Sequence, residues 1–129
     1  MFVFVLNEHS GVPTYVQLAQ QVRNALRLGL LRPGDQLPTA REVVAGLAIN
    51  PNTVLKAYRE LEREGLVSPR PGAGTFIRRG LGSASPEDRD RLYRQLREWV
   101  ARARAVGLDD EDIEALYAGA REAHTARGA

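Results

Sequence analysis

Cysteine is absent from this sequence of 129 residues, and histidine occurs only twice, as His9 and His124. Without cysteine the chain can form no disulfide, no thiolate zinc site and no cysteine nucleophile. The two histidines lie far apart and have no ligand-spaced partner. No apolar run approaches the roughly 18 residues that a membrane-spanning helix needs, and the apolar start lacks the basic leader and cleavage site of a signal peptide. We therefore expect a cytoplasmic protein with no metal, no cofactor and no membrane contact.

Net charge is also small, because 18 basic side chains oppose 16 acidic ones and leave a formal charge of +2. Lys56 is the sole lysine, and the other 17 basic residues are arginines. The balance differs along the chain: residues 1–83 hold 10 basic and 6 acidic groups, whereas residues 84–129 hold 8 basic and 10 acidic groups. The first part therefore carries +4 and the second −2. This asymmetry indicates that the N-terminal part meets a polyanion and that the C-terminal part has another role.

Hydrophobic periodicity and turn residues predict a mainly α-helical chain with a small β-hairpin. Helices are expected over residues 14–30, 40–46, 51–64 and 86–106, and again after Asp109. Strands are expected over residues 2–6, 66–68 and 75–77. The second and third helices are short and closely linked, which is typical of a helix-turn-helix. The hairpin that follows them, with Gly72-Ala73-Gly74 between its strands, has the position of a wing.

Capping signals support these helix starts. Thr39 and Glu42 have the spacing of a capping box, and Asn50 precedes a proline, as an N-cap precedes proline at the first helical position. Ser85 is expected to cap the fourth helix. The small residues over 80–85 are typical of a linker. The fold class is therefore a winged helix-turn-helix followed by a two-helix C-terminal region.

Several segments also carry a family resemblance. Residues 10–18 (SGVPTYVQL), 30–42 (LLRPGDQLPTARE), 50–54 (NPNTV) and 57–66 (AYRELEREGL) resemble, in order and spacing, the winged helix-turn-helix domain of GntR-type bacterial transcription regulators. The short helical tail is similar to that of the YtrA-type subfamily. The resemblance implies a DNA-binding domain over 1–79, a linker over 80–85 and a helical dimerisation region over 86–126. It also implies a sequence-specific transcription regulator, a repressor, that is not an enzyme.

Candidate DNA contacts lie at the start of the helix over 51–64, because the first turn of a recognition helix commonly meets base edges and phosphates. Short polar groups and one cation are available there: Asn50, Asn52, Thr53 and Lys56. Asn50 has a second interpretation as a structural cap, and it can serve both purposes. Arg59 could face phosphate together with Lys56, or it could belong to a solvated run of charges.

Arg41 is a candidate through the resemblance, which implies that an arginine at this position contacts DNA. The alternative for Arg41 is a surface ion pair with Glu42 or Glu64.

The hairpin supplies a further group of candidates, which are Arg70, Gly72, Gly74 and Thr75. Glycine lets the backbone approach the sugar-phosphate chain closely, and Arg70 is the main expected contact. Pro71 and Ala73 stand where the family often has basic residues. This departure weakens the expected electrostatic contribution of the wing.

The two C-terminal helices carry an apolar stripe that is expected to form a dimer interface: Leu92, Leu96, Trp99, Ile113, Leu116 and Tyr117. Two isolated short helices are not stable in water, so they pack either on their own winged helix or on a second copy. We expect the second copy, because a linker separates the tail from the rest. A symmetric homodimer would place two recognition helices on a pseudo-palindromic operator with half-sites ~10 bp apart. A small-molecule effector near Trp99 and Tyr117 is not evident and stays open.

Two other classes of function compete with this prediction. For an enzyme or a metal site, the densest acidic group is residues 109–112, but acidic residues at a helix N-terminus suit the helix dipole without any metal. For a winged-helix protein–protein adaptor without DNA binding, the exposed face of the helix over 51–64 should be apolar, and it is polar. We therefore predict double-stranded DNA as the partner, with no catalytic residue and no bound metal.

Overall fold

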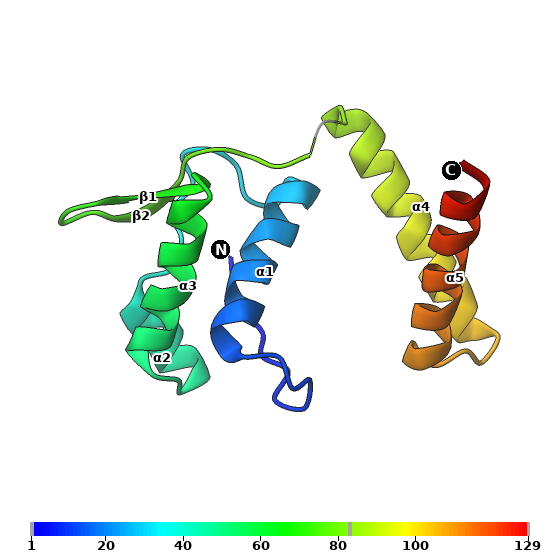
Figure 1. Cartoon of the computed structure of the whole chain (residues 1–129), viewed down its shortest axis with the longest axis horizontal. Coiled ribbons are helices and arrows are strands. Elements are labelled where there is room, and N and C mark those ends of the chain that lie inside the picture. The colour runs from blue at the N-terminus through cyan, green and yellow to red at the C-terminus, as the bar shows by residue number, and fades with distance from the viewer. Residues whose placement is uncertain (1, 83, 129) are drawn as a thin grey trace. The chain divides into compact units, whose positions relative to one another are not determined.

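The computed structural model describes residues 2–82 and 84–128, with side chains up to residue 123. They form two units that meet between residues 84 and 85, here called the body and the tail. The body contains α1 (Thr14–Leu28), α2 (Ala40–Leu47) and α3 (Pro51–Arg63), and the tail contains α4 (Pro86–Ala105) and α5 (Asp110–Gly128) (Figure 1). The helices of the body end within two residues of their predicted limits, which is the usual uncertainty of helix ends.

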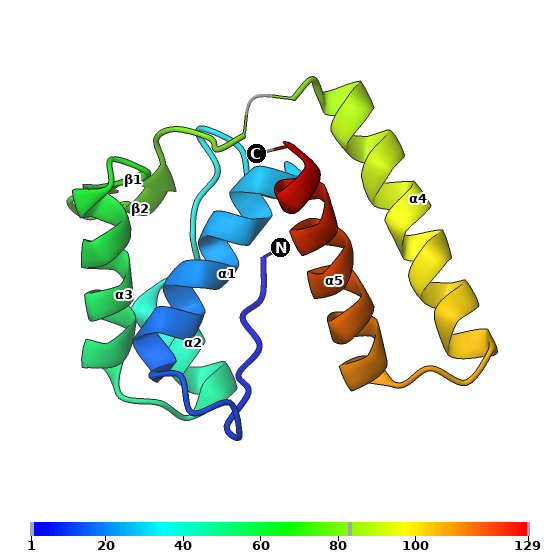
Figure 2. The same cartoon turned by 45° about the vertical axis from the view of Figure 1, so that its right-hand side comes forward.

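α3 is the central helix of the body, because it packs against both α1 and α2. Its inner face consists of Val54, Ala57 and Leu61, which are fully buried and recur at the spacing of one helix face. Leu18 and Val22 of α1 are also fully buried in the same core. The apolar area removed from water here is the main source of stability of the body. Figures 1 and 2 both show α2 beside the first turns of α3.

A two-stranded antiparallel hairpin follows α3 directly. It consists of β1 (Val67–Arg70) and β2 (Gly74–Ile77), with Val67 paired to Ile77. The chain before α2 also bonds to β2: the Leu37 N–H donates to the Thr75 carbonyl at 2.9 Å, and the Ile77 N–H donates to the Asp35 carbonyl at 2.8 Å. These bonds tie the wing to the segment that leads into the helix-turn-helix.

Residues 2–6 are not a strand, so this part of the prediction was wrong. The alternation that suggested a strand is present, since Phe4 is buried while Val3 and Val5 are 71% and 70% exposed. The segment has no neighbouring strand, however. The Val5 N–H donates to Gln21 Oε1 at 2.9 Å, and the Val5 carbonyl accepts from Gln21 Nε2. A side chain of α1 thus takes the place that a strand partner would occupy.

Both tail helices begin with a side-chain cap, and the cap at Ser85 was predicted. Ser85 Oγ accepts from the Asp88 N–H at 3.1 Å, and Asp109 Oδ1 accepts from the Asp112 N–H at 2.8 Å. Leu81, within the predicted linker, packs against the core of the body, so the chain remains attached to the body beyond the wing. Ser83, and the side chain of His124, lie outside the described residues.

Candidate nucleic-acid interface

The turn between α2 and α3 fixes the geometry of the helix-turn-helix. Thr39 Oγ1 accepts from the Glu42 N–H at 3.1 Å and Glu42 Oε1 accepts from the Thr39 N–H at 3.2 Å, which completes the predicted capping box. α2 ends at Ala48 in the left-handed region, with φ 54° and ψ 44°. Asn50 Oδ1 then accepts from the Asn52 N–H at 2.8 Å. The capping interpretation of Asn50 is therefore confirmed.

Polar side chains occupy the face of α3 opposite its buried one. Asn52, Lys56 and Arg59 are all exposed, and their spacing of four and three residues places them on one side of the helix. Thr53 lies half-buried beside them. We call these four residues the outer face of α3. It offers short hydrogen-bonding groups for base edges and two cations for phosphates.

The two cations of the outer face have different surroundings. Lys56 Nζ lies 4.0 Å from the centre of the Tyr15 ring, in the first turn of α1, which is a cation–π contact. Arg59 makes no hydrogen bond or ion pair with any described residue, and the neighbouring Glu60 is paired with Arg63 at 2.7 Å. The sequence did not predict this contact, because the proximity of Tyr15 to Lys56 depends on how α1 packs on α3.

Arg41 is exposed in the first turn of α2 and makes no hydrogen bond or ion pair within the described part of the chain. Arg41 forms no ion pair with Glu42 or Glu64, which were the partners considered as the alternative to a DNA contact. Glu42 is engaged with Thr39 in the capping box. Glu64 binds Arg23, with Nε to Oε1 at 2.9 Å and Nη2 to Oε2 at 2.5 Å. The guanidinium of Arg41 thus has free donors of the kind that bind phosphate or guanine bidentately.

The Arg23–Glu64 pair connects α1 to the C-terminal end of α3. The hydrogen bond from Arg23 lowers the pKa of the Glu64 carboxyl group, and the same bond raises the pKa of Arg23. Arg79, which follows the wing, donates from Nη2 to the backbone carbonyl of Glu64 at 2.7 Å. Two arginines therefore anchor this end of α3, and they neutralise a carboxylate that would otherwise repel a polyanion.

Arg70 occupies the end of β1, where it is exposed. Its Cζ lies 4.3 Å from the centre of the Phe76 ring on β2, so the guanidinium is held over an aromatic face. Thr75 is half-buried, and its carbonyl is already used by Leu37. Arg70 is therefore the positively charged candidate of the wing. The backbone carbonyl of Thr75 joins the wing to the segment before α2.

Gly72 and Gly74, the two glycines of the wing, differ in what surrounds them. Gly72 has φ 75° at the exposed tip, and an added Cβ would meet nothing within 4 Å. Gly74 has φ 128°, and an added Cβ would lie 2.5 Å from Nε2 of Gln36. Gln36 donates from that nitrogen to the Ala73 carbonyl at 3.0 Å. Both glycines have a positive φ that L side chains rarely adopt. A side chain at Gly72 would enter open space at the tip, whereas one at Gly74 would also displace the flexible end of Gln36.

The tail exposes most of its apolar stripe. Ala103 is buried in the tail, whereas four of the six predicted interface residues are between 48% and 59% exposed: Leu92, Leu96, Leu116 and Tyr117. Trp99 and Ile113 are half-buried. Over the described residues, the backbones of α4 and α5 approach each other closely at most at a few positions. The tail therefore leaves apolar side chains without cover.

The acidic residues at the start of α5 have partners within the chain. Asp109 and Asp112 each accept the backbone N–H of the other, at 2.8 and 3.1 Å. Asp110 pairs with Arg104 at 2.9 Å. The described part of the chain contains no cluster of three potential metal ligands. None of its described helices has the length and apolar character to cross a membrane.

A short helix-turn-helix continued by a hairpin defines the winged-helix class of DNA-binding proteins. The family model described as "Bacterial regulatory proteins, gntR family" matches residues 14–77. The chain is 35% identical over 109 residues to the HTH-type transcriptional repressor YtrA of Bacillus subtilis (strain 168), and the match covers 84% of each chain. The chain therefore belongs to the GntR family, and it is a transcription regulator with a DNA-binding domain.

Solved structures agree with this assignment. YtrA from Sulfolobus acidocaldarius, a GntR-family transcription factor, aligns over 92% of this chain and 97% of its own, with a TM-score of 0.55 and 26% identity. AraR(DBD) in complex with operator ORX1 aligns over 60% of this chain and 95% of its own, with a TM-score of 0.51 and 25% identity. The first likeness covers nearly the whole chain and so includes both body and tail, whereas the second covers fewer residues than the body contains.

Proposed function

We propose that the protein is a repressor that binds a pseudo-palindromic operator as a homodimer. In this proposal residues 1–79 bind DNA, residues 80–85 link the two regions, and residues 86–126 hold two copies of the chain together. The observation that carries its DNA-binding part is the polar outer face of α3 together with an exposed Arg41 that has no ion pair with any described residue. The relative in Bacillus subtilis is named a repressor, and AraR(DBD) was solved with an operator. We further propose that the protein acts in the cytoplasm.

Base reading is assigned to the first turn of α3. Asn52 can bond an adenine bidentately through its amide, and the methyl group of Thr53 can contact a thymine methyl. Lys56 and Arg59 are assigned to phosphates, with Tyr15 holding Lys56 in place. Arg41 approaches the same stretch of DNA from α2, while Asn50 acts mainly by fixing the start of α3.

The wing is assigned a weaker, sequence-independent role beside the minor groove. Arg70 is its cation, and the open tip at Gly72 allows the backbone to approach the sugar-phosphate chain. Gly74 and Thr75 support that geometry through their contacts with the segment before α2. Because Pro71 and Ala73 carry no charge, the wing contributes few counterion-releasing contacts.

The tail is assigned to dimerisation through its exposed stripe. Burial of Leu92, Leu96, Leu116 and Tyr117 against a second copy would remove apolar surface from water, and a twofold axis makes the same patch serve both copies. The two bodies would then meet half-sites about one helical turn apart, ~10 bp.

Operator binding by single-site variants tests the DNA-reading part. Bound sites are first mapped across the genome, and affinity for the recovered operator is then measured by fluorescence anisotropy. Arg41→Ala and Asn52→Ala should each weaken binding by about 1–3 kcal/mol. Arg63→Ala is the matched control, because it removes an arginine from the last turn of α3 that is paired with Glu60 and lies about 16 Å along the helix from Asn52. Unchanged affinity in the Arg41→Ala/Asn52→Ala double variant would show that the site is misplaced.

Sedimentation tests the proposed dimer interface, and the salt dependence of DNA binding tests the adaptor alternative. Leu96→Glu with Leu116→Glu should convert a dimer into a monomer, whereas a tail that still sediments as a dimer would contradict the assigned interface. The adaptor alternative predicts no binding to random duplex DNA. A GntR-type DNA reader should bind it with an affinity that falls steeply as salt rises.

A further inference from the structure

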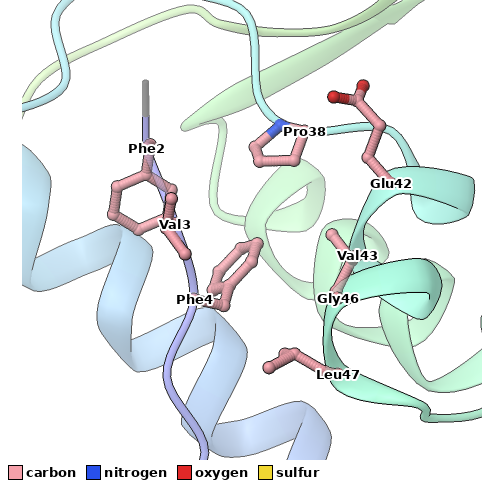
Figure 3. Close-up of a pocket in the computed structure, with 8 residues that line it drawn as sticks. All are labelled: Phe2, Val3, Phe4, Pro38, Glu42, Val43, Gly46 and Leu47. Atoms are coloured by element: carbon pink, nitrogen blue, oxygen red, sulfur yellow. The ribbon is translucent and has the colours of Figure 1, made fainter.

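The body contains a cavity that the proposed DNA contacts do not use. It lies between the segment of residues 2–4 and α2, and it has a volume of about 210 Å³. Phe2 and Phe4 form one wall, and Val43 and Leu47 form the other (Figure 3). Figure 3 shows Phe4 on one side and Val43 and Leu47 on the other, turned toward one another across an open space. The cavity is large enough for a small organic molecule, since about 150 Å³ of apolar cavity holds benzene.

The walls of the cavity are fixed in place. Phe4 is buried and its ring lies 6.4 Å from that of Tyr58, while Phe2 meets Phe4 edge to face at 4.9 Å. The segment behind them is held by both backbone hydrogen bonds of Val5 to Gln21. The cavity therefore belongs to the folded body rather than to a loose end of the chain.

Gly46 keeps the α2 side of the cavity open. It is the second-to-last residue of α2 and lines the space, and an added Cβ would meet nothing within 4 Å. Its φ is not in the left-handed region, so the backbone does not require glycine there. Glycine in a helix is about 1 kcal/mol less favourable than alanine. A side chain at this position of α2 would therefore extend into the cavity without meeting a neighbouring atom.

One charged side chain lies at the edge of the cavity. Glu42 is the sole charged residue among the described ones that line the cavity, and Figure 3 shows its carboxylate beyond the ring of Pro38. Glu42 Oε1 accepts from Thr39 N–H and Oγ1 at 3.2 and 3.0 Å. Oε2 receives no hydrogen bond from the described residues. Arg41, the adjacent basic residue, does not share a helix face with Glu42.

We propose that this cavity binds a small organic cation, with an ammonium group at Glu42 and an aromatic or aliphatic body between the phenylalanines and α2. The apolar walls favour the body of such a molecule, the free carboxylate oxygen favours the ammonium group, and the same carboxylate repels an anion. The site is separate from the outer face of α3, and its occupation does not depend on the proposed operator or dimer. Because α2 also presents Arg41, the bound cation would lie against the DNA-reading part of the body.

Three probes of one shape and different charge test the site: 2-phenylethylammonium, neutral 2-phenylethanol and anionic 3-phenylpropanoate. Each is titrated into the full chain at neutral pH, and the backbone amide signals of Val43, Gly46 and Leu47 are followed by NMR. The cation should bind about three- to five-fold more tightly than the alcohol, as expected of one solvent-accessible ion pair. The anion should bind more weakly than the alcohol.

Variants of α2 distinguish the contribution of the cavity's shape to probe binding from that of the Glu42 charge. Gly46→Leu fills the cavity and should abolish saturable shifts with all three probes, whereas Ala45→Leu adds the same side chain at an exposed neighbouring position and should leave binding unchanged. Glu42→Gln preserves the capping box, which accepts glutamine, and should remove the advantage of the cation over the alcohol. The proposal is overturned by a wild-type chain that shows no saturable shift with the cation at millimolar concentration, by Gly46→Leu binding as well as wild type, or by an anion that binds as tightly as the cation.

Discussion

Ala48 provides the sharpest test of how the helix-turn-helix is built. Among the described residues it is the one non-glycine with a positive φ, at 54°. The left-handed conformation costs an L-residue roughly 1–2 kcal/mol, and the exposed methyl group of Ala48 contributes no buried contact in return. Ala48→Gly removes the steric cost, but it also adds freedom to the unfolded chain worth about 0.4–1 kcal/mol. The difference predicts a gain of about 0.5–1 kcal/mol in the free energy of unfolding of the body.

Gly65→Ala is the matched reverse experiment. Gly65 follows α3 with φ 77°, and an added Cβ would meet only the side chain of Arg79, at 3.9 Å. There is no clash, so the same conformational cost appears without a packing change. We expect Gly65→Ala to lower the free energy of unfolding by about 1 kcal/mol.

Native-state hydrogen exchange of the full chain is the suitable measurement, because the only tryptophan, Trp99, lies in the tail. The slowest amides of α1 and α3 report global opening of the body. The two variants should shift these amides in opposite directions. A less stable Ala48→Gly, or a more stable Gly65→Ala, would refute the reasoning from backbone conformation.

Three further predictions concern contacts between elements. Tyr58→Phe removes the hydrogen bond from the Tyr58 hydroxyl to the Pro38 carbonyl, which spans 2.6 Å, and should cost about 1 kcal/mol by the same exchange measurement. Glu64→Gln should cost at most about 1 kcal/mol at neutral pH, because the ion pair is partly exposed. Since Arg23 lowers the pKa of Glu64 from its ordinary value of 4.5, the stabilisation is present above that pH and is lost as the pH falls through the lowered pKa; the two proteins should converge in acid. Ala73→Arg should strengthen DNA binding at low salt and steepen the logarithmic salt slope by about 1.

Local signals explain why so much of the body could be predicted from the sequence. The capping box of Thr39 and Glu42, and the N-cap at Asn50 before Pro51, depend on residues within a few positions of one another. The buried stripe of α3 follows from helical periodicity alone. Each of these features is determined by residues close to it in the sequence, so it can be predicted without knowledge of the tertiary structure.

The features that the sequence did not reveal all depend on distant residues. Residues 2–6 have the composition of a strand, but their backbone bonds to the side chain of Gln21. The contact of Lys56 with Tyr15 requires the packing of α1 on α3, and the bond of Arg79 to Glu64 requires the return of the chain after the wing. No local pattern distinguishes such partners from ordinary surface residues.

The attachment of Leu81 to the core changes how much chain connects body and tail. Gly82 still lies near the end of α1, since a Cβ built there would be 4.0 Å from the Arg27 carbonyl, and Pro86 already begins α4. An extended chain advances at most about 3.6 Å per residue, so the connection reaches roughly 14 Å. Covalent geometry therefore sets an upper limit on the distance between Gly82 and the start of α4. If the tail joins two copies, this limit bounds the half-site spacings that one dimer can span.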